Sequence, residues 1–295
     1  MSTPRSGSTL LMEMIAEQPF VLPVREPLNL RRKYIEDTLG LHKWEEIYSF
    51  DNYQHIVKYL QSFRFNLTVD SRFKREKPFS HTWHPVTSRL AYKILHGLEH
   101  KADELFKDLN AKTVILIRHP IPVSLSREEL PRYNAFLQSD VSEFFSKEQL
   151  KFASQSLKSG TQFEKSIISW CFQNKLLLQK SERNLLITYE ELVMNREPVI
   201  QKLAEYLNLP KPDKMLLRSL KPSGSTDKSS QTNKELLQEV QKGSASFLQL
   251  INKWKGKVDM EMVQNAQNIL NLFDIDIYTA EEIMPSPKYL ISGKK

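Results

Sequence analysis

Small polar residues and one arginine near the start of the chain, in the stretch STPRSGSTLL, have the types and the spacing of an anion-binding loop. Backbone N–H groups converge on an anion most readily where the side chains are small. Four small residues occur here in a row: Ser6, Gly7, Ser8 and Thr9. The apolar residues that follow recur at helical spacing, so we expect a helix to begin near Gly7 or Ser8 with its positive end toward the anion.

This loop departs from the nucleoside-triphosphate pattern G-x-x-x-x-G-K-[ST] at its most informative position. Ser8 stands where that pattern has its lysine, and Ser2 stands where it has its first glycine. Arg5 supplies a cation instead, and its planar guanidinium can grip a phosphate through two donors. We therefore expect the loop to hold an anion other than a magnesium-bound triphosphate. An ordinary Ser/Gly helix cap is the alternative interpretation.

A second stretch whose residue types could bind a ligand is VILIRHPIPVSLSR, which begins at Val114. Its apolar residues predict a buried strand with Arg118 at the carboxyl end, where open α/β sheets bind their ligands. Arg118 on the strand and the hydroxyl of Ser126 on the following helix can approach one anion from two sides. The stretch therefore predicts a second phosphate site, and a rim arginine paired with a carboxylate is the alternative.

The elements that must position these residues follow from the apolar pattern. Short apolar runs predict strands at residues 20–24, 90–95, 113–117 and 185–188. Helical spacing covers residues 99–109, 149–181, 198–207, 234–253 and 260–273. Strands that alternate with helices predict an α/β fold, in which helices cover both faces of a mostly parallel sheet.

Composition limits the class of protein. The chain has 295 residues, 40% of them hydrophobic, which is enough for a sizeable core. Its 42 Lys and Arg against 35 Asp and Glu give a net charge of +7, which suits an anionic ligand but is too evenly scattered for a nucleic-acid partner. The sequence has one cysteine and no long apolar window or signal peptide, so we expect no membrane span and a cytoplasmic location.

In this order along the chain, the two phosphate motifs resemble those of the sulfotransferases that use 3′-phosphoadenosine 5′-phosphosulfate (PAPS). PRSGST resembles the family's 5′-phosphosulfate loop, and R-H-P-x-x-x-x-x-S resembles its 3′-phosphate signature. Further matches are Arg25-Glu26-Pro27, the run ITYEEL that ends at Leu192, and Lys253-Trp254-Lys255. The resemblance spans nearly the whole chain.

The resemblance implies a single sulfotransferase-like domain over residues 1–295. Its fold would be three-layer α/β/α with a central mostly parallel sheet, of the P-loop nucleotide-binding type. The family places a β-strand directly before the phosphate loop, where this chain has only Met1-Ser2-Thr3. We therefore expect the first strand to be short or missing.

The resemblance also implies roles for individual residues. Arg5 would bridge the 5′-phosphate and the transferring sulfuryl group, and would stabilise the charge that develops on the leaving phosphate. The small residues after it would complete the 5′-phosphosulfate site: Ser6, Gly7, Ser8 and Thr9. Arg118 and Ser126 would hold the 3′-phosphate, and Tyr189 would lie near the adenine. No metal is expected, because the nucleotide presents no β,γ-phosphate pair for magnesium to bridge.

The acceptor must lose a proton, so a general base is needed. Cytosolic family members use a histidine in a K-x-H context at the end of the strand that precedes the 3′-phosphate strand. In LAYKILHGLEH this implies His96 with Lys93 as its partner, although the spacing is one residue longer. His81 and His84, in FSHTWHP, are the next candidates. Other family members use a glutamate, for which Glu26 is the match.

The function implied is the in-line transfer of a sulfuryl group from PAPS to a hydroxyl or amine acceptor, with adenosine 3′,5′-bisphosphate as the product. The acceptor is a small molecule, a carbohydrate or a lipid, and its pocket is expected to come from loops at residues 44–65, 72–85 and 128–146. The oligomeric state is not predicted. Two alternatives are a P-loop kinase or NTPase and a non-catalytic nucleotide-binding relative.

Overall fold

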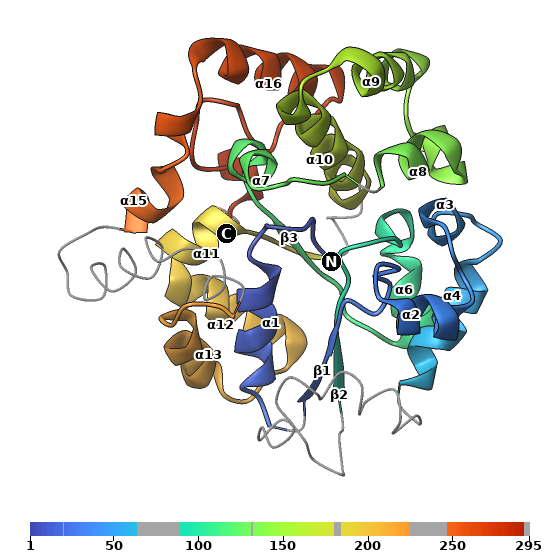
Figure 1. The fold of residues 1–295 in the computed structure, drawn as a ribbon. Coiled ribbons are helices and arrows are strands. Elements are labelled where there is room, and N and C mark those ends of the chain that lie inside the picture. The colour runs from blue at the N-terminus through green and yellow to red at the C-terminus, as the bar shows by residue number, and fades with distance from the viewer. Residues whose placement is uncertain (20, 64–88, 131, 180–183, 225–246, 292–295) are drawn as a thin grey trace.

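Two pairs of parallel strands lie at the centre of the protein (Figure 1). Strand β1 (Val21–Arg25) pairs with β2 (Arg89–Lys93), and β3 (Val114–Ile117) pairs with β4 (Leu185–Thr188). All four strands lie where the apolar runs predict them, and both pairings are parallel as expected. The structure is a computed structural model that describes the chain apart from residues 20, 64–88, 131, 180–183, 225–246 and 292–295.

The first residues of the chain lie between the two strand pairs. Ser2 forms an isolated parallel bridge with Leu116 of β3. The Leu116 N–H donates to the carbonyl of Met1 (2.9 Å), and the Ser2 N–H donates to the carbonyl of Ile94 just beyond β2 (3.1 Å). The expected single sheet is therefore wrong in detail. The described strands form two two-stranded sheets, because the segment between them makes one bridge and no ladder.

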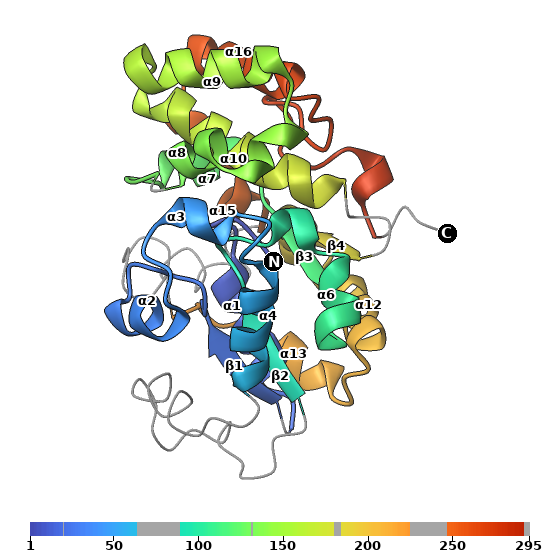
Figure 2. The same cartoon turned by 90° about the vertical axis from the view of Figure 1, so that its right-hand side faces the viewer.

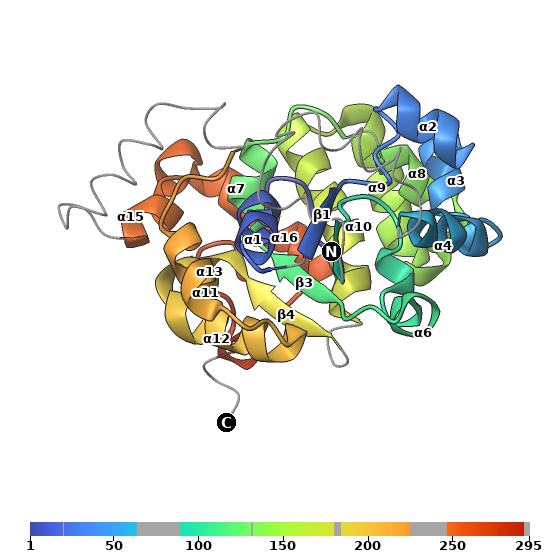
Figure 3. The same cartoon turned by 90° about the horizontal axis from the view of Figure 1, so that it is seen from below.

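Helices surround the strands. Figures 1 and 3 show α11, α12 and α13 on one side of the strands and α2, α3, α4 and α6 on the other. Helices α9, α10 and α16 gather at one end (Figure 2). No helix in the described ranges is long and apolar enough to span a membrane. The helices are α1 Ser8–Ala16, α2 Lys33–Leu39, α3 Trp44–Ile47, α4 Tyr53–Ser62, α6 Glu104–Leu109, α7 Pro120–Leu125, α8 Tyr133–Gln138, α9 Lys147–Ser159, α10 Gln162–Leu178, α11 Tyr189–Met194, α12 Arg196–Leu207, α13 Pro212–Ser219, α15 Phe247–Asn252 and α16 Met260–Leu272.

The helix expected over residues 149–181 is two helices. Helix α9 ends at Gly160, and α10 starts from a capping box at Thr161. The Thr161 hydroxyl accepts from the Glu164 N–H (3.2 Å), and the Glu164 carboxylate accepts from the Thr161 N–H (2.7 Å). This exchange satisfies backbone groups that a continuous helix would bond internally, so the chain turns here. In the same way, residues 99–109 divide into a 3₁₀ turn (Glu99–Lys101) and α6.

Two of the three segments expected as acceptor-binding loops contain helices. Residues 44–65 include α3 and α4, and residues 128–146 include α8 and a 3₁₀ helix (Asp140–Phe144). In α4 the buried side chains recur at helical spacing, which is the signal that the loop interpretation missed: Tyr53, Ile56, Val57, Tyr59 and Leu60. The third segment, residues 72–85, lies outside the described residues, as does most of the helix expected over 234–253.

Helix α10 anchors the largest core through an aromatic cluster. The ring of Phe172 stacks on Phe136 with centroids 5.2 Å apart. Its edges meet three further rings, which belong to Tyr133, Phe145 and Phe273. Aromatic side chains in such contacts bury large apolar areas, so this cluster holds α10 firmly against α8 and α16. The position of α10 matters for the site, because Trp170 and Gln173 project from it.

We expect Phe172→Ala to lower the free energy of unfolding by about 3–5 kcal/mol, because it opens a cavity among four rings. Urea denaturation of the full chain measures this loss. The control is Phe144→Ala, whose side chain is 39% exposed, and we expect it to cost about 1 kcal/mol or less. Equal losses in the two variants would contradict the role given to the cluster.

Candidate active site

The loop before α1 is tightly bent and leads directly into the helix. Helix α1 begins at Ser8 with Gly7 as its N-cap, as the sequence predicts. Arg5 (φ +72°) and Gly7 (φ +86°) both have left-handed backbones, which bend the loop tightly. The hydroxyls of Thr3 and Ser6 are buried and lie 2.5 Å apart, so they hold the loop from inside. The N-cap is glycine, which the alternative interpretation of an ordinary Ser/Gly helix cap also allows, so the helix start alone does not separate the two interpretations.

Tyr189 covers the loop from the end of β4. It is the first residue of α11, and its ring lies directly over Gly7. A Cβ atom built on Gly7 would lie 2.4 Å from Cδ2 of this ring, so there is no room for a side chain. The glycine is therefore required both by its positive φ and by this close approach. The contact joins the loop to an element far away in the sequence.

Arg118 lies at the carboxyl end of β3, beside the same loop. Its guanidinium donates to the carbonyl of Arg5 (3.0 Å), and its Cζ is 4.4 Å from the centroid of the Tyr189 ring. The Trp170 indole N–H donates to the Arg118 carbonyl (3.0 Å) and fixes the strand end. The Nε atom of Arg118 is buried without a hydrogen-bond partner in the described structure. The two phosphate motifs thus adjoin at one edge.

Ser126 is not joined to Arg118. Its hydroxyl donates to the carbonyl of Val123 in α7 (2.8 Å), and the described residues show no hydrogen bond between the two predicted 3′-phosphate ligands.

His119, which follows Arg118, is buried and hydrogen-bonded within the fold. Its Nδ1 accepts from the Ile121 N–H (3.3 Å) at the start of α7, and burial lowers its pKa to about 3.

Two further stretches singled out in the sequence, Lys253-Trp254-Lys255 and ITYEEL, lie close to the end of β3. The Trp254 ring stacks on His119 with centroids 4.6 Å apart. The pKa of Lys253 is lowered by burial and by the charges of Lys257 and Arg118, so this lysine lies within electrostatic reach of Arg118. The buried Glu190 carboxylate accepts from the His119 N–H (3.1 Å) and ties β3 to α11.

Lys93, Glu26 and Thr9 form a second group. The Lys93 ammonium at the end of β2 donates to the Glu26 carboxylate (2.9 Å) and to the Thr9 hydroxyl (3.0 Å). Asn29 donates to the other Glu26 oxygen (2.9 Å). Burial opposes the ionisation of Glu26, but Lys93, Asn29 and Arg32 outweigh it and hold the pKa of this carboxyl below its usual value. Glu26 is therefore a charged carboxylate that is fully occupied by partners.

His96, three residues after Lys93, is nearly buried, and its ring centroid lies 4.9 Å from that of Trp44. Its Nδ1 is enclosed and has no hydrogen-bond partner within the described chain. Burial, followed by the charges of Arg132, Arg127 and other cations, lowers the pKa of His96 well below 6.5. The imidazole is therefore neutral near neutral pH. His81 and His84 lie outside the described residues.

A buried polar network behind His96 has no counterpart among the sequence predictions. Arg132 donates to the carbonyl of Leu95 (2.5 Å) and to the Gln173 side chain (2.8 Å). Gln173 in turn donates to the Glu99 carboxylate (2.9 Å). The network fixes the backbone next to His96. Only the glutamine within the apolar run of α10 could have signalled it, because the other members belong to no motif.

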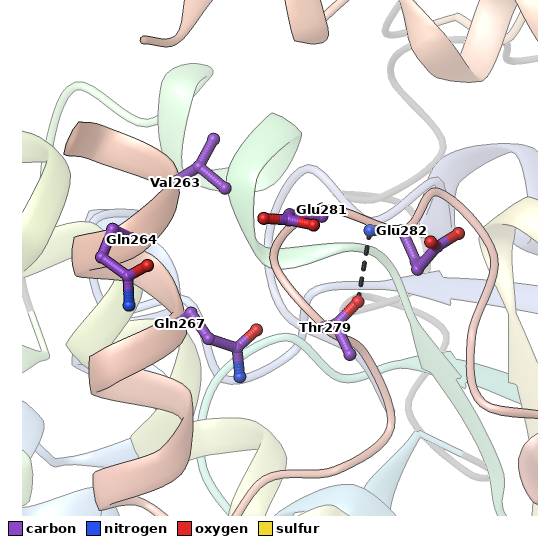
Figure 4. A pocket seen from close by; sticks show the side chains of 6 residues that line it. All are labelled: Val263, Gln264, Gln267, Thr279, Glu281 and Glu282. Atoms are coloured by element: carbon purple, nitrogen blue, oxygen red, sulfur yellow. Dashed lines mark hydrogen bonds between the residues drawn. The ribbon is translucent and has the colours of Figure 1, made fainter. Parts of the chain in front are cut away.

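A pocket of about 390 Å³ lies elsewhere, beside α16 (Figure 4). Its lining is Val263, Gln264, Gln267, Thr279, Glu281 and Glu282. Two carboxylates and no cation line it, so it does not suit an anionic nucleotide. The hydroxyl of Thr279 accepts from the Glu282 N–H (3.2 Å), which the figure shows as a dashed line. The candidate active site is therefore at the strand ends and not in this pocket.

The solved structures that are similar to the chain include two proteins of similar length. One is described as "Sulfotransferase Domain from the Curacin Biosynthetic Pathway". It is 17% identical, with 93% of this chain and 95% of that chain covered and a TM-score of 0.44. The other is described as "Sulfotransferase Domain from the Synechococcus PCC 7002 Olefin Synthase". It is 17% identical, with 90% and 91% covered and a TM-score of 0.43.

None of the curated proteins compared with the chain matches it. A family model described as "Sulfotransferase domain" matches residues 1–280. This match covers nearly the whole chain, including the phosphate loop, Arg118 and the end of β4. The protein therefore belongs to the sulfotransferase family.

Proposed function

We propose that the protein transfers a sulfuryl group from PAPS to a hydroxyl or amine group of an acceptor. One observation carries the proposal: the Arg118 guanidinium donates to the Arg5 carbonyl (3.0 Å), so two anion-binding motifs meet at one edge. The residues present suit an anionic nucleotide. The Arg5 side chain makes no hydrogen bond or ion pair in the described structure, and Arg118 keeps a buried Nε without a partner.

In this proposal each motif holds one end of the nucleotide. The backbone N–H groups of the loop and the Arg5 guanidinium bind the 5′-phosphosulfate at the positive end of α1. Arg118 binds the 3′-phosphate, and Tyr189, which already stacks on Arg118, lies against the adenine. Ser126 joins Arg118 once its hydroxyl turns away from the Val123 carbonyl. The three-layer P-loop arrangement of a single domain belongs to the same proposal.

Bound PAPS supplies the sulfuryl group, whose S–O bond to the 5′-phosphate breaks as the acceptor atom bonds to sulfur. Arg5 and the start of α1 stabilise the negative charge that the 5′-phosphate gains. Arginine holds its protons too tightly to donate one, so this stabilisation is electrostatic. His96 accepts the proton that the acceptor loses. Its ring is neutral near neutral pH, so an unprotonated nitrogen is available, while the lowered pKa makes it a weak base.

Glu26 has a different role in this proposal. As an ionised carboxylate bound to Lys93 and Asn29, it has little tendency to take up a further proton. It positions the Lys93 ammonium, which reaches Thr9 at the first turn of α1. The same contact weighs against a kinase or NTPase, because the hydroxyl that would face magnesium in such a protein faces a lysine here.

The reaction is proposed to need no metal. The reason is that the nucleotide presents no β,γ-phosphate pair for magnesium to bridge. The expected behaviour is unchanged sulfuryl transfer in the presence of EDTA.

The non-catalytic alternative gives a different result. A non-catalytic nucleotide-binding protein would bind adenosine 3′,5′-bisphosphate and transfer no sulfuryl group to any of a broad acceptor panel.

Arg118→Ala is expected to weaken binding of adenosine 3′,5′-bisphosphate at least about tenfold, a loss of about 1.4 kcal/mol or more. The affinity for 5′-AMP should change less, because that nucleotide lacks the 3′-phosphate. Calorimetric titration measures both constants, with magnesium-ADP as a competitor. Arg89→Ala removes an equal charge at the far end of β2 and serves as the control. Equal losses for the two nucleotides would contradict the 3′-phosphate role.

Gly7→Ala is expected to reduce bisphosphate affinity at least about tenfold, because its Cβ would displace Tyr189 and strain the loop. The control is Gly40→Ala, which has φ +70° and open space around its Cβ. It should lower the unfolding midpoint without changing calorimetric affinity. Full binding by Gly7→Ala would refute this loop geometry.

His96→Gln is expected to lower kcat by about 10²–10⁴-fold, because the general base is lost. Bisphosphate affinity should stay within about twofold of the original. In the unchanged protein the acidic limb of the pH–rate profile should lie below pH 6.5, because a lowered pKa keeps the imidazole unprotonated until the pH falls further. The control is His42→Gln at an exposed site. If His96→Gln kept the limb and the rate, another residue would be the base.

A further inference from the structure

Four cationic side chains act electrostatically on His96. After burial itself, the causes that lower the pKa of this histidine are the charges of Arg132, Arg127, Arg31 and Lys93. Arg31 follows β1, Lys93 is the last residue of β2 and Arg127 follows α7. Arg132 is the N-cap of α8. Helix α8 packs against α3, which carries Trp44 (Figure 2). The candidate base therefore lies in a strongly positive environment with an aromatic ring beside it.

Three of these four cations have a carboxylate partner. The pairs are Lys93 with Glu26 (2.9 Å), Arg132 with Glu99 (3.5 Å) and Arg31 with Glu129. Arg127 has none in the described part of the chain. Its side chain is 7% exposed, and one of its terminal nitrogens is enclosed without any hydrogen bond.

A buried guanidinium without a partner is costly. Moving a charge out of water costs several kcal/mol, and only an opposite charge or good hydrogen bonds offset this. Burial and the neighbouring cations, chiefly Arg132, lower the pKa of Arg127 to about 9. The backbone of Arg127 is fixed, because its backbone N–H donates to the Ser124 carbonyl near the end of α7 (3.2 Å). The Arg127 guanidinium therefore lacks an anionic partner among the described residues.

The nucleotide does not supply that anion in our proposal. Its phosphates are assigned to Arg5, Arg118 and Ser126. Arg127 follows Ser126 in the sequence, but its charge acts on His96, and Arg5 and Arg118 are not among the residues whose charge acts on Arg127. The groups that do act on Arg127 are Arg132, Tyr48 and Arg31. Arg127 therefore belongs to the side of the site where His96 meets the acceptor.

On the basis of the proposed function, we propose that the acceptor carries an oxyanion, such as a carboxylate, phosphate or sulfate, which Arg127 binds while the reacting group faces His96. A guanidinium matches the geometry of such oxyanions with two parallel hydrogen bonds. The Trp44 ring offers a flat apolar surface for the body of the acceptor. An acidic acceptor would thus neutralise the unpaired charge.

The first test needs no ligand. We expect Arg127→Met to raise the midpoint of thermal unfolding by about 2 °C or more, because it replaces an unpaired buried charge with an apolar side chain of similar length. The control, Arg89→Met, removes an exposed arginine that donates to the carbonyls of Leu207 and Asn208, and should not raise the midpoint. A lower midpoint for Arg127→Met would show a structural arginine and overturn the inference.

The second test compares acids with their neutral esters. The probes are 4-hydroxybenzoate, 4-hydroxyphenylacetate and 3-(4-hydroxyphenyl)propanoate with their methyl esters, titrated calorimetrically with and without saturating adenosine 3′,5′-bisphosphate. We expect at least one acid to bind about tenfold more tightly than its ester, and Arg127→Met to remove this difference. Arg89→Met should keep it.

Equal affinity of acids and esters, including no binding of either, would overturn the inference. Such a result would leave the proposed function intact as long as the bisphosphate binds. Conversely, failure of the unchanged protein to bind the bisphosphate would refute the proposed function, while the midpoint of Arg127→Met still reports on the unpaired charge. The two failures are thus distinguishable.

Discussion

The hydrogen bonds of the first residues to both strand pairs are the contact on which the site depends. Ser2 donates to the Ile94 carbonyl on one side, and the Met1 carbonyl accepts from Leu116 on the other. This segment keeps the carboxyl ends of β2 and β3 at a fixed separation. The loop of residues 3–7 begins directly after it, so hydrogen bonds to both sheets fix where the loop starts.

Charge is divided between two halves of the edge. Arg5 and Arg118 lie around the loop, with Tyr189 between loop and arginine. Arg127 and Arg132 lie around His96. Lys93 connects the halves, because its ammonium reaches Thr9 of α1 while its strand continues toward His96. Of these cations, Lys93 and Arg132 have carboxylate partners, whereas Arg5, Arg118 and Arg127 have none among the described residues.

Local patterns predicted the strands, the start of α1 and the place of Arg118, because each depends on neighbours in sequence. The buried network of Arg132, Gln173 and Glu99 was not predictable in this way. Its members come from three distant segments and meet only through tertiary packing. The break before α10 was predictable in principle, since the Thr161 capping box is written in the sequence. Sheet continuity depends on pairing between segments, which periodicity does not encode.

The contact between Tyr189 and Gly7 has a consequence for folding. It joins residues separated by most of the chain, and the bridge between Ser2 and Leu116 is also long-range. Contacts of such high sequence separation form slowly, because a large loop must close before any of them is gained. We therefore expect the N-terminal loop to take its final shape late, after β3 and β4 have paired. A folding intermediate that lacks the loop would have much of its core and no nucleotide site.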